Sequence, residues 1–386
     1  MRDHRQVTDV VSTAALAGGP RLGAGPHHRT ERRMTTGFEH ETLGQRVRFT
    51  RDGAAEGVAA EVSHLGAERV MVIASGAGEA LAARVTADIP VVLVHDDVVM
   101  HVPVEVADRA REAAESSGAD ALVCLGGGST TGLAKAVALT TGLPIVAVPT
   151  TYAGSEATNV WGLTEDAVKT TGVDARVLPR AIVYDASLTT SLPVDLSVAS
   201  GLNALAHCVD SMWAPRSDPI DRALAEEGIR ALGGALPRVV DAPGDLAGRE
   251  RMLYGAYLAA VAFSSAGSGL HHKICHVLGG RYGLPHAQTH AVVLPHVLAL
   301  NAPRSPEAEA RISRALGSDS ALAGLQELRD RIDAPTSLRD FGLREEQLAD
   351  AASAVLPAVP PSNPVTLSTD DLERLLRRAW EGADPR

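Results

Sequence analysis

Short apolar runs alternate with helical patterns over the first half of the chain. Runs at 70–74, 91–95, 121–125, 145–148 and 181–184 are nearly continuous in apolar residues, which is typical of parallel strands buried on both faces. The stretches between the first four runs are rich in alanine and follow the helical period. This alternation predicts a doubly wound α/β domain built on a parallel sheet.

The pattern changes on either side of the fifth run. Residues 159–177 carry Trp, Thr, Lys and Gly without a helical period, which favours a β-hairpin. After Leu192 and Pro193 the sequence is periodic in Ala, Leu and Val as far as Arg378. We therefore expect an α/β domain over 34–192 and an all-helical domain over 193–386, whose last helix begins at Ser368 with a capping box to Asp371.

The first 33 residues differ from the rest, because they mix Arg, His, Gly and Pro around one short apolar patch. A signal peptide would need a longer apolar core and a small-residue cleavage site. We expect a disordered N-terminal extension, or a chain whose working start is Met34.

Charge and cysteine content narrow the class of protein. A net charge of -11 without a basic stripe argues against a nucleic-acid partner, and no apolar run approaches the ~18 residues of a membrane span. The three cysteines, Cys124, Cys208 and Cys275, are odd in number and far apart. This usage suits a reducing compartment, so we expect a cytoplasmic protein.

A glycine-rich loop follows the third apolar run. It reads Gly126, Gly127, Gly128, Ser129 and Thr130 and leads into a helical pattern. Glycines let the backbone approach a phosphate, and a following helix points its N-terminal amides at the anion. A plain strand-to-helix turn is the alternative interpretation. The glycine spacing differs from the dinucleotide-binding fingerprint, which also belongs on a first strand.

A second polar loop follows the fourth run and contains Thr150, Thr151 and Tyr152. The carboxyl ends of parallel strands lie at one edge of a sheet, so both loops should border the crevice where open α/β sheets bind ligands. Ser75 follows the first run, where an NAD-selective dehydrogenase often has a carboxylate for the ribose hydroxyls. Since Ser75 would not repel a 2′-phosphate, we expect both NADH and NADPH to bind.

Seven of the 14 histidines fall in two segments of the helical half. They are His207, His271, His272, His276, His286, His290 and His296. Asn203 and His207 share a helical face because they are four residues apart, as do His272 and His276. So many imidazoles indicate a metal site, or acid/base and anion-binding chemistry near neutral pH. We expect His290 and His296 to be structural, and we leave His271 open.

The order of these motifs, with the segment 185–193, resembles the iron-containing alcohol dehydrogenases over nearly all of 45–380. In that superfamily an Asp and a His four apart, and two later His fourteen apart, hold a divalent metal. The matching residues here are Asn203, His207, His272 and His286. This chain departs from the pattern at Asn203, where the family has the carboxylate, and at Gly132, where it usually has Asp.

Both departures resemble one branch of the superfamily, the maleylacetate reductases, which are regarded as metal-independent. Further matching segments lie at 99–103, 152–156, 161–165, 169–172, 177–179 and 379–382. The resemblance implies a homodimeric enzyme of aromatic-compound catabolism that uses NADH or NADPH, without metal, to reduce the carbon–carbon double bond of maleylacetate to 3-oxoadipate. The substrate is a small dicarboxylate keto acid.

This chemistry builds negative charge on the ketone oxygen and then requires a proton. Our hypothesis gives His207, His272 and His286 the contacts to the enolate and the carboxylates, and makes His276 the proton donor. The remaining catalytic candidates are Asn203 and Lys273, with Arg281 as a further possible carboxylate partner.

Three other interpretations remain open. The first is a metal-dependent alcohol or aldehyde dehydrogenase that keeps zinc or iron through His207, His272 and His286. The second is a lyase that resembles dehydroquinate synthase, and the third is a non-catalytic NAD-binding or interaction protein. The sequence also leaves open whether the substrate is maleylacetate, a chlorinated analogue or a related unsaturated keto acid.

Overall fold

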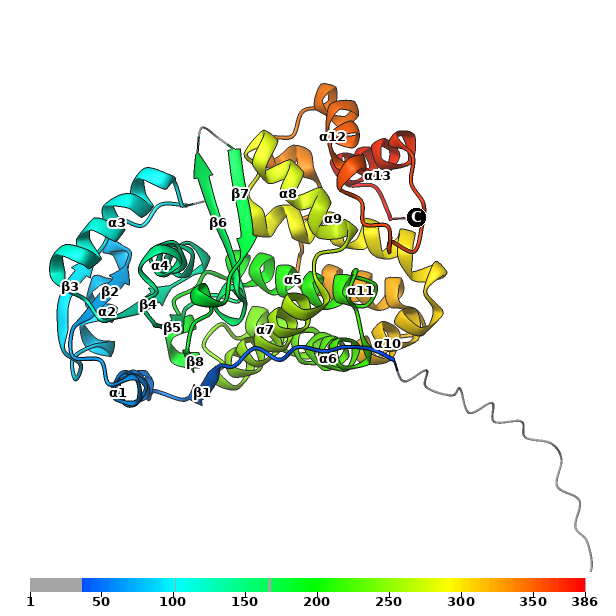
Figure 1. Ribbon diagram of the computed structural model, residues 1–386. Coiled ribbons are helices and arrows are strands. Elements are labelled where there is room, and N and C mark those ends of the chain that lie inside the picture. Colours follow the sequence, from blue (N-terminus) through cyan, green and yellow to red (C-terminus); the bar gives the residue numbers. More distant parts are fainter. Residues whose placement is uncertain (1–36, 101, 166–167, 386) are drawn as a thin grey trace, which may run out of the picture. The chain divides into compact units, whose positions relative to one another are not determined.

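Six parallel strands form the central sheet of the first half (Figure 1). The computed structural model describes residues 37–100, 102–165 and 168–385, so the expectation for residues 1–33 lies outside the described residues. The strands are β1 (Arg46–Thr50), β2 (Val70–Ala74), β3 (Val91–His95), β4 (Ala121–Gly126), β5 (Ile145–Pro149) and β8 (Ala181–Asp185). Their order across the sheet is β1-β8-β5-β4-β2-β3.

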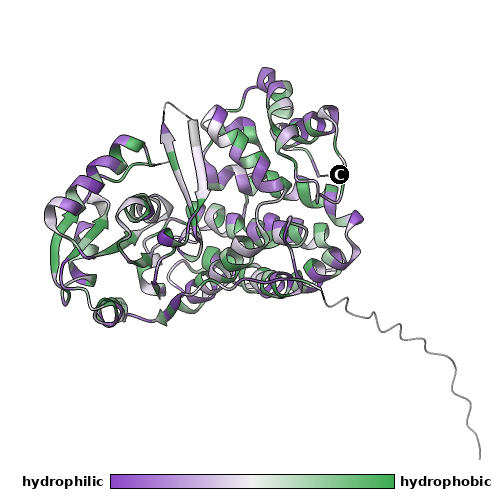
Figure 2. Ribbon diagram, in the orientation of Figure 1, coloured by the Kyte–Doolittle hydropathy of each residue, from purple (hydrophilic) through white to green (hydrophobic). Residues whose placement is uncertain are grey.

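Helices cover both faces of this sheet. They are α1 (Ala54–Leu65), α2 (Glu79–Val85), α3 (Val104–Ser117) and α4 (Gly128–Thr141). Alternate strand residues point to opposite faces, so Met71 and Ile73 pack with α3 and α4, while Val70 and Val72 pack with α1 and α2. The strands are accordingly hydrophobic along most of their length (Figure 2). The predicted doubly wound sheet is confirmed.

One strand of the sheet was absent from the pattern analysis. Strand β1 pairs with β8 alone, at the edge of the sheet. Its sequence alternates Arg46 and Arg48 with Val47 and Phe49, and Arg46 and Phe49 are exposed. An edge strand of this kind lacks the continuous apolar run that marks the buried strands. The glycine-rich loop therefore follows the fourth strand of the chain, not the third.

Asp185, at the end of β8, fastens the start of α1 to the sheet. Its carboxylate accepts hydrogen bonds from the backbone N–H groups of Asp52 (3.1 Å), Gly53 (2.8 Å) and Ala54 (2.9 Å). It also accepts from the backbone N–H and the hydroxyl of Ser187. Burial alone would raise the pKa of Asp185, but these hydrogen bonds outweigh it and lower the pKa.

The predicted hairpin is present as β6 (Val160–Glu165) and β7 (Val168–Val173), an antiparallel pair outside the main sheet. The segment before it is bound to α4 by Lys135, whose side chain is buried. The Lys135 ammonium donates to the carbonyl oxygens of Ser155 (2.6 Å), Thr158 (2.8 Å) and Val160 (2.8 Å) and to the Thr158 hydroxyl.

After β8 the described residues form helices and no strand, as predicted. The helices are α5 (Val194–Ser211), α6 (Pro219–Asp241), α7 (Leu246–Ala266), α8 (Leu270–Tyr282), α9 (His286–Asn301), α10 (Pro306–Leu316), α11 (Ala321–Arg331), α12 (Leu348–Val355) and α13 (Thr369–Glu381). The capping box of Ser368 and Asp371 at the start of α13 is confirmed. No helix in this described part is long and apolar enough to cross a membrane.

Short 3-10 segments complete the fold. They are η1 (Gly76–Gly78), η2 (Ser155–Ala157), η3 (Ala175–Val177), η4 (Ala186–Thr189), η5 (Ala302–Arg304), η6 (Leu338–Phe341), η7 (Glu345–Gln347) and η8 (Leu356–Ala358). Residues Glu39–Arg386 form one compact unit. Helices α5, α6 and α7 share a hydrophobic core with Tyr152, Ile182 and Tyr184 from the α/β half, so the two halves pack on each other.

Candidate active site

The glycine-rich loop begins where β4 ends. Gly126 has a φ of +151°, and a Cβ there would lie 2.4 Å from Thr130 Oγ1. Only glycine fits this position without displacing Thr130. Gly127 precedes α4 and forms no side-chain cap, which leaves the first backbone N–H groups of the helix for an anion. The predicted phosphate loop thus has the local geometry that phosphate binding needs.

The two predicted loops lie against each other. Gly126 pairs with Pro149 across β4 and β5, and Thr150 N–H donates to Gly126 O at 3.0 Å. A Cβ on Gly127 would lie 3.1 Å from Thr151 Cγ2, so the backbone and Thr151 are in close approach. Ser75 is exposed just after β2, the other neighbour of β4. The expected crevice therefore has three adjacent loops along one edge of the sheet.

Tyr152, which was predicted to contact the cofactor, has its side chain in the protein core. Its side chain is fully buried, and its hydroxyl accepts a hydrogen bond from Arg249 Nη1 at 3.0 Å. Arg249, also buried, donates to Ser197 Oγ and to the carbonyl oxygens of Leu192 and Pro243. The Tyr152 side chain therefore joins the β5 loop to α7 within the core, where it is removed from a ligand in the crevice.

Gly132, the second departure from the superfamily pattern, lies in close contact with a neighbouring segment. A Cβ at this position would be 3.0 Å from Val102 Cγ2, and Val102 itself has a positive φ of 48°. An aspartate here would press on Val102, so the substitution by glycine fits the way that segment packs on α4.

The predicted histidines meet in the helical half. The rings of His207 (α5) and His272 (α8) stack at 4.8 Å with an interplanar angle of 13°. His276 lies 6.1 Å from His272 and 6.4 Å from His286. Phe263 of α7 packs on His207 at 4.8 Å and on His272 at 4.3 Å. Residues 79 positions apart are thereby brought into one cluster, as the resemblance to the iron-containing alcohol dehydrogenases implied.

Asp210 holds His272 in place, and the sequence analysis did not single it out. Its carboxylate is fully buried, lies 2.8 Å from His272 Nδ1 and accepts from the Gly269 N–H at 2.8 Å. A Cβ at Gly269 would lie 2.3 Å from Asp210 Oδ1, so glycine allows this approach. The Nδ1 proton of His272 points at the carboxylate, which leaves Nε2 as a lone-pair donor.

Burial keeps the central imidazoles neutral. It lowers the pKa of His207 to about 3 and that of His272 well below the ordinary value, with smaller contributions from neighbouring histidines. Burial also raises the pKa of Asp210 to about 6, against the opposing effect of the Gly269 N–H. At pH 7 the site therefore has neutral rings beside one buried carboxylate.

Several buried polar atoms at this position have no hydrogen-bond partner among the described residues. They are Asn203 Oδ1, His207 Nδ1, His272 Nε2 and His290 Nε2. Such atoms are costly unless something binds them. The oxygen of Asn203 and the ring nitrogens of His207 and His272 are suitable ligands for a divalent cation, with a neutral amide in place of a carboxylate. The amide of Asn203 and the ring of His207 can also donate to the oxygens of a keto acid, whereas His272 Nε2 can only accept.

The other predicted residues lie further out. His276 and His286 are exposed, and Lys273 is half-buried on α8. Arg281, at the end of α8, is bound elsewhere: its guanidinium pairs with Asp350 at 2.6 Å and 2.7 Å. Because Arg281 already pairs with a carboxylate of this chain, it is not placed to bind a carboxylate of the substrate.

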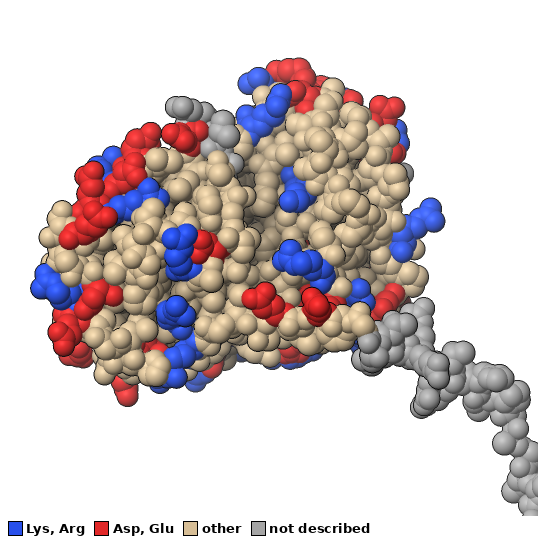
Figure 3. Space-filling model, viewed as in Figure 1, with Lys and Arg blue, Asp and Glu red and all other residues tan. Residues whose placement is uncertain are grey.

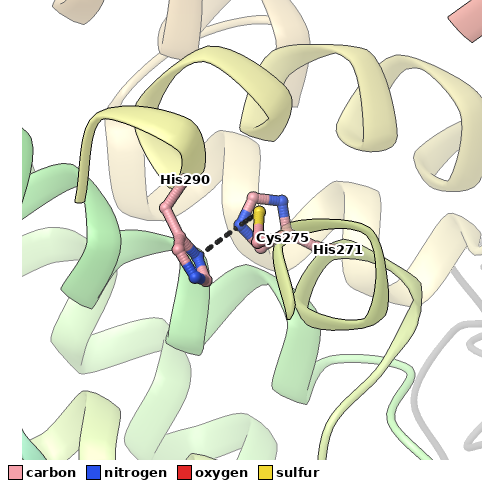
Figure 4. A group of neighbouring side chains, drawn as sticks. All are labelled: His271, Cys275 and His290. Carbon is pink, nitrogen blue, oxygen red and sulfur yellow. Dashed lines mark hydrogen bonds between the residues drawn. The ribbon is translucent and has the colours of Figure 1, made fainter. Parts of the chain in front are cut away.

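A metal ion could also be held by three buried neighbouring residues, His271, Cys275 and His290 (Figure 4). His271 Nε2 and His290 Nδ1 are 2.9 Å apart, and Cys275 Sγ is 3.8 Å from His271 Nε2. His290 was expected to be structural, but its ring lies 4.8 Å from that of His272 and 4.4 Å from that of His286. It therefore belongs to the cluster.

The charged residues on the surface show no extended patch of one sign on the face drawn in Figure 3, where acidic and basic side chains are interspersed. This distribution agrees with the acidic net charge and offers no basic path for a nucleic acid on that face.

The chain belongs to the iron-containing alcohol dehydrogenase family. The family profile "Iron-containing alcohol dehydrogenase" matches residues 45–186, and "Fe-containing alcohol dehydrogenase family, C-terminal" matches 197–380. Within this family, the chain is 45% identical to the maleylacetate reductase of Burkholderia cepacia over 335 residues, which cover 86% of this chain and 95% of the relative.

Crystal structures place it in the same group. An iron-containing alcohol dehydrogenase from Corynebacterium glutamicum superposes with a TM-score of 0.89 at 57% identity, covering 90% of this chain and 98% of that one. The maleylacetate reductase from Agrobacterium tumefaciens gives 0.86 at 41% identity, covering 90% and 99%. The protein is thus an oxidoreductase of this family that is similar to maleylacetate reductases, which confirms the predicted resemblance.

Proposed function

We propose that the protein reduces the carbon–carbon double bond of maleylacetate with NADH or NADPH to give 3-oxoadipate. The observation that carries the proposal is the cluster of His207, His272, His276 and His286, in a chain 45% identical to a maleylacetate reductase. Neutral imidazoles can donate hydrogen bonds to an enolate and its carboxylates, and an exposed one can pass on a proton.

The cofactor is assigned to the crevice at the end of the sheet. Gly126, Gly127 and Gly128, with Ser129 and Thr130, would bind the pyrophosphate through backbone N–H groups and hydroxyls. Thr150 and Thr151 border the same space, since they follow β5 next to β4. Ser75 brings no negative charge to the position expected for the ribose, so the proposal includes both NADH and NADPH.

The chemistry divides between cofactor and histidines. A reduced nicotinamide bound in the crevice would supply a hydride for the alkene carbon that is conjugate to the ketone, so negative charge would develop on the ketone oxygen as an enolate. We assign His207 and His286, with Asn203, to the enolate and the carboxylates. His272 lines the same site, but its Nε2 can only accept a hydrogen bond, because its Nδ1–H faces Asp210. His276, which is exposed, would return a proton to the neighbouring carbon, and Lys273 would contact a carboxylate.

We further propose that this reduction needs no metal. The carboxylate of the family's metal set is Asn203 here, which removes a negative charge from the ligand set, so a cation would be bound more weakly. If a divalent cation is held, His207, His272 and His286 are the residues that would hold it, and it would polarise the ketone as a Lewis acid. The unpartnered nitrogens of His207 and His272 keep the metal-dependent alcohol dehydrogenase as the second candidate.

The proposal also covers the roles of the two domains, the oligomeric state and the cellular compartment. We assign residues 34–192 to cofactor binding and 193–386 to substrate binding, in a cytoplasmic homodimer. The three cysteines are free and buried, which suits a reducing compartment. Size-exclusion chromatography with light scattering would test the dimer.

The deciding experiment is NADH and NADPH oxidation with maleylacetate, with and without EDTA, on the purified enzyme. Rapid oxidation that resists the chelator would support the proposal. Turnover of simple aldehydes that EDTA abolishes, with none of maleylacetate, would support the metal-dependent dehydrogenase in its place.

A further inference from the structure

The buried pair of His271 and His290 carries an inference that deepens the proposed function and rests on it. Both rings are fully buried, and the hydrogen bond between them needs an N–H on one ring nitrogen and a lone pair on the other. A buried imidazolium would be costly, so each ring is taken as neutral, with a single N–H. Two protons are shared among four nitrogen atoms.

The hydrogen bond between the rings uses one of these protons. It joins His271 Nε2 to His290 Nδ1 at 2.9 Å, the dashed line in Figure 4. If His271 donates, the second proton lies on His290 Nε2. If His290 donates, the second proton lies on His271 Nδ1. Neither of those two outer nitrogens has a hydrogen-bond partner among the described residues, so the arrangement leaves one N–H without an acceptor.

The surroundings of the two outer nitrogens decide between these tautomers. His290 lies at the centre of the cluster, with the rings of His286, His272 and His207 at 4.4, 4.8 and 6.4 Å. Its Nε2 is on the edge of the ring opposite the one that meets His271. A substrate oxygen in the cluster could accept from it. Among the described residues the ring of His271 contacts those of His272 at 5.2 Å and His290 at 4.8 Å, so it borders fewer rings of the cluster than His290 does. A buried N–H without an acceptor is destabilising, which favours the tautomer whose second N–H is on His290.

We propose that His290 is a further catalytic residue, which donates a hydrogen bond from Nε2 to an oxygen of the bound keto acid, and that His271 is the positioning residue that fixes this tautomer. Asp210 does the opposite for His272, whose Nε2 it leaves as a lone pair. The cluster thus presents a fixed donor at His290 beside a fixed acceptor at His272. A neutral donor aimed at an oxygen that gains charge contributes to the rate.

The chain offers a matched pair of substitutions. In His290→Gln the side-chain amide reaches the position of Nε2, whereas in His290→Asn it reaches only that of Nδ1, next to His271. We expect His290→Asn to lower kcat/KM about 10-fold to 100-fold, in the range for loss of one such donor, and His290→Gln to retain activity within about threefold. A lower kcat points to the enolate oxygen, and a higher KM points to a carboxylate.

His271→Leu should lower kcat/KM as much as His290→Asn does, whereas His271→Gln should restore a hydrogen-bond donor to His290. The double variant with His271→Leu and His290→Asn should lose no more kcat/KM than either single variant. His296→Gln is the control, because His296 is a buried histidine of the same helix α9. Equal losses in His290→Asn and His290→Gln, or wild-type constants in His290→Asn, would overturn the proposal.

A second readout needs no substrate. Nitrogen NMR of the ¹⁵N-histidine-labelled enzyme should show His290 protonated at Nε2 and His271 at Nε2, with the His290 tautomer altered in His271→Leu. The opposite assignment in the wild type would overturn the proposal even if maleylacetate is reduced. If maleylacetate is not reduced at all, the proposed function fails, while the NMR result still decides the tautomer.

A metal ion between these side chains is the rival arrangement. Cobalt(II) bound to His271, Cys275 and His290 would give a thiolate-to-metal absorption that disappears in Cys275→Ser. That band would also overturn the proposal, because the metal would replace the shared proton. The family's metal positions contain no sulfur, so the two sites are distinguished by this signal.

Discussion

Replacing Asp210 with asparagine should disable the site without unfolding the protein. The charged hydrogen bond from His272 Nδ1 at 2.8 Å becomes a neutral one or is lost. Hydrogen bonds to charged groups contribute roughly 1.5–3 kcal/mol. A loss of about 2 kcal/mol in the transition state lowers kcat/KM about 30-fold, since 1.36 kcal/mol is a factor of ten. The amide keeps an oxygen for the Gly269 N–H, so the junction of α5 and α8 should persist.

The assay is the initial rate of NADH oxidation with maleylacetate, measured beside the thermal midpoint and the dissociation constant of NADH. We expect the dissociation constant to stay within about twofold, because Asp210 lies in the helical half. Asp350→Asn is the control, since that carboxylate is exposed and pairs with Arg281. If Asp210→Asn keeps kcat/KM within about threefold of wild type, the ionised Asp210 does not orient His272, and our account of the site is wrong.

Three other substitutions test the loop, the fold and the histidine roles. Gly126→Ala should weaken NADH binding at least ~10-fold, because its Cβ would meet Thr130 Oγ1 at 2.4 Å; fluorescence titration measures this. Asp185→Asn should lower the free energy of unfolding by about 2 kcal/mol at pH 7. This loss of unfolding free energy should be present above the unfolded-state pKa of Asp185, about 3.9, and should disappear as the pH falls through the lower pKa of the folded state. Urea denaturation at several pH values measures it. His207→Ala and His276→Ala should each lower kcat about 10-fold or more.

Each of these expectations has a result that contradicts it. Gly234→Ala is the control for Gly126→Ala, because a Cβ at Gly234 meets nothing within 4 Å. Equal NADH affinity in the two variants would show that a Cβ at Gly126 does not hinder NADH binding. A loss in Asp185→Asn that is the same at pH 3 and pH 7 would show that charge is not its cause. Unchanged turnover in both His207→Ala and His276→Ala would end the assignment of the cluster to catalysis.

The sequence predicts the fold wherever the burial pattern is unambiguous. The five predicted strands appear at their predicted positions because their residues are nearly all apolar, and the helical half follows from its period. The expectation of burial on both faces is wrong for β3, which lies at an edge of the sheet and exposes Val92 and Val94. Strand β1 was not predicted, because Arg46 and Arg48 alternate with apolar residues in a strand that has one neighbour. Its place is decided by pairing with β8, which is more than 130 residues away in sequence.

The sequence indicated which histidines gather but not the contacts that hold them. Helical spacing predicts that His272 and His276 share a face, since it depends on local geometry alone, and the rings of His207, His272 and His276 do lie together. Asp210 and His290 carry no local signal, because an aspartate on α5 and a histidine on α9 acquire partners only when the helices pack. Three positions after His207, Asp210 lies on the same helical face, and that spacing was the available clue. Tyr152 was assigned to the cofactor because its loop position says nothing about the buried Arg249.

The burial of Lys135 has a practical consequence for following this protein in solution. The chain contains three lysines, Lys135, Lys169 and Lys273, among 36 basic residues. The Lys135 amine is enclosed and donates to four oxygen atoms, so amine-reactive reagents should modify it only after α4 separates from the segment that leads to β6. Mass spectrometry of the peptide that contains Lys135 would then follow the opening of the α/β half at a single residue, because the chain has only two other lysines.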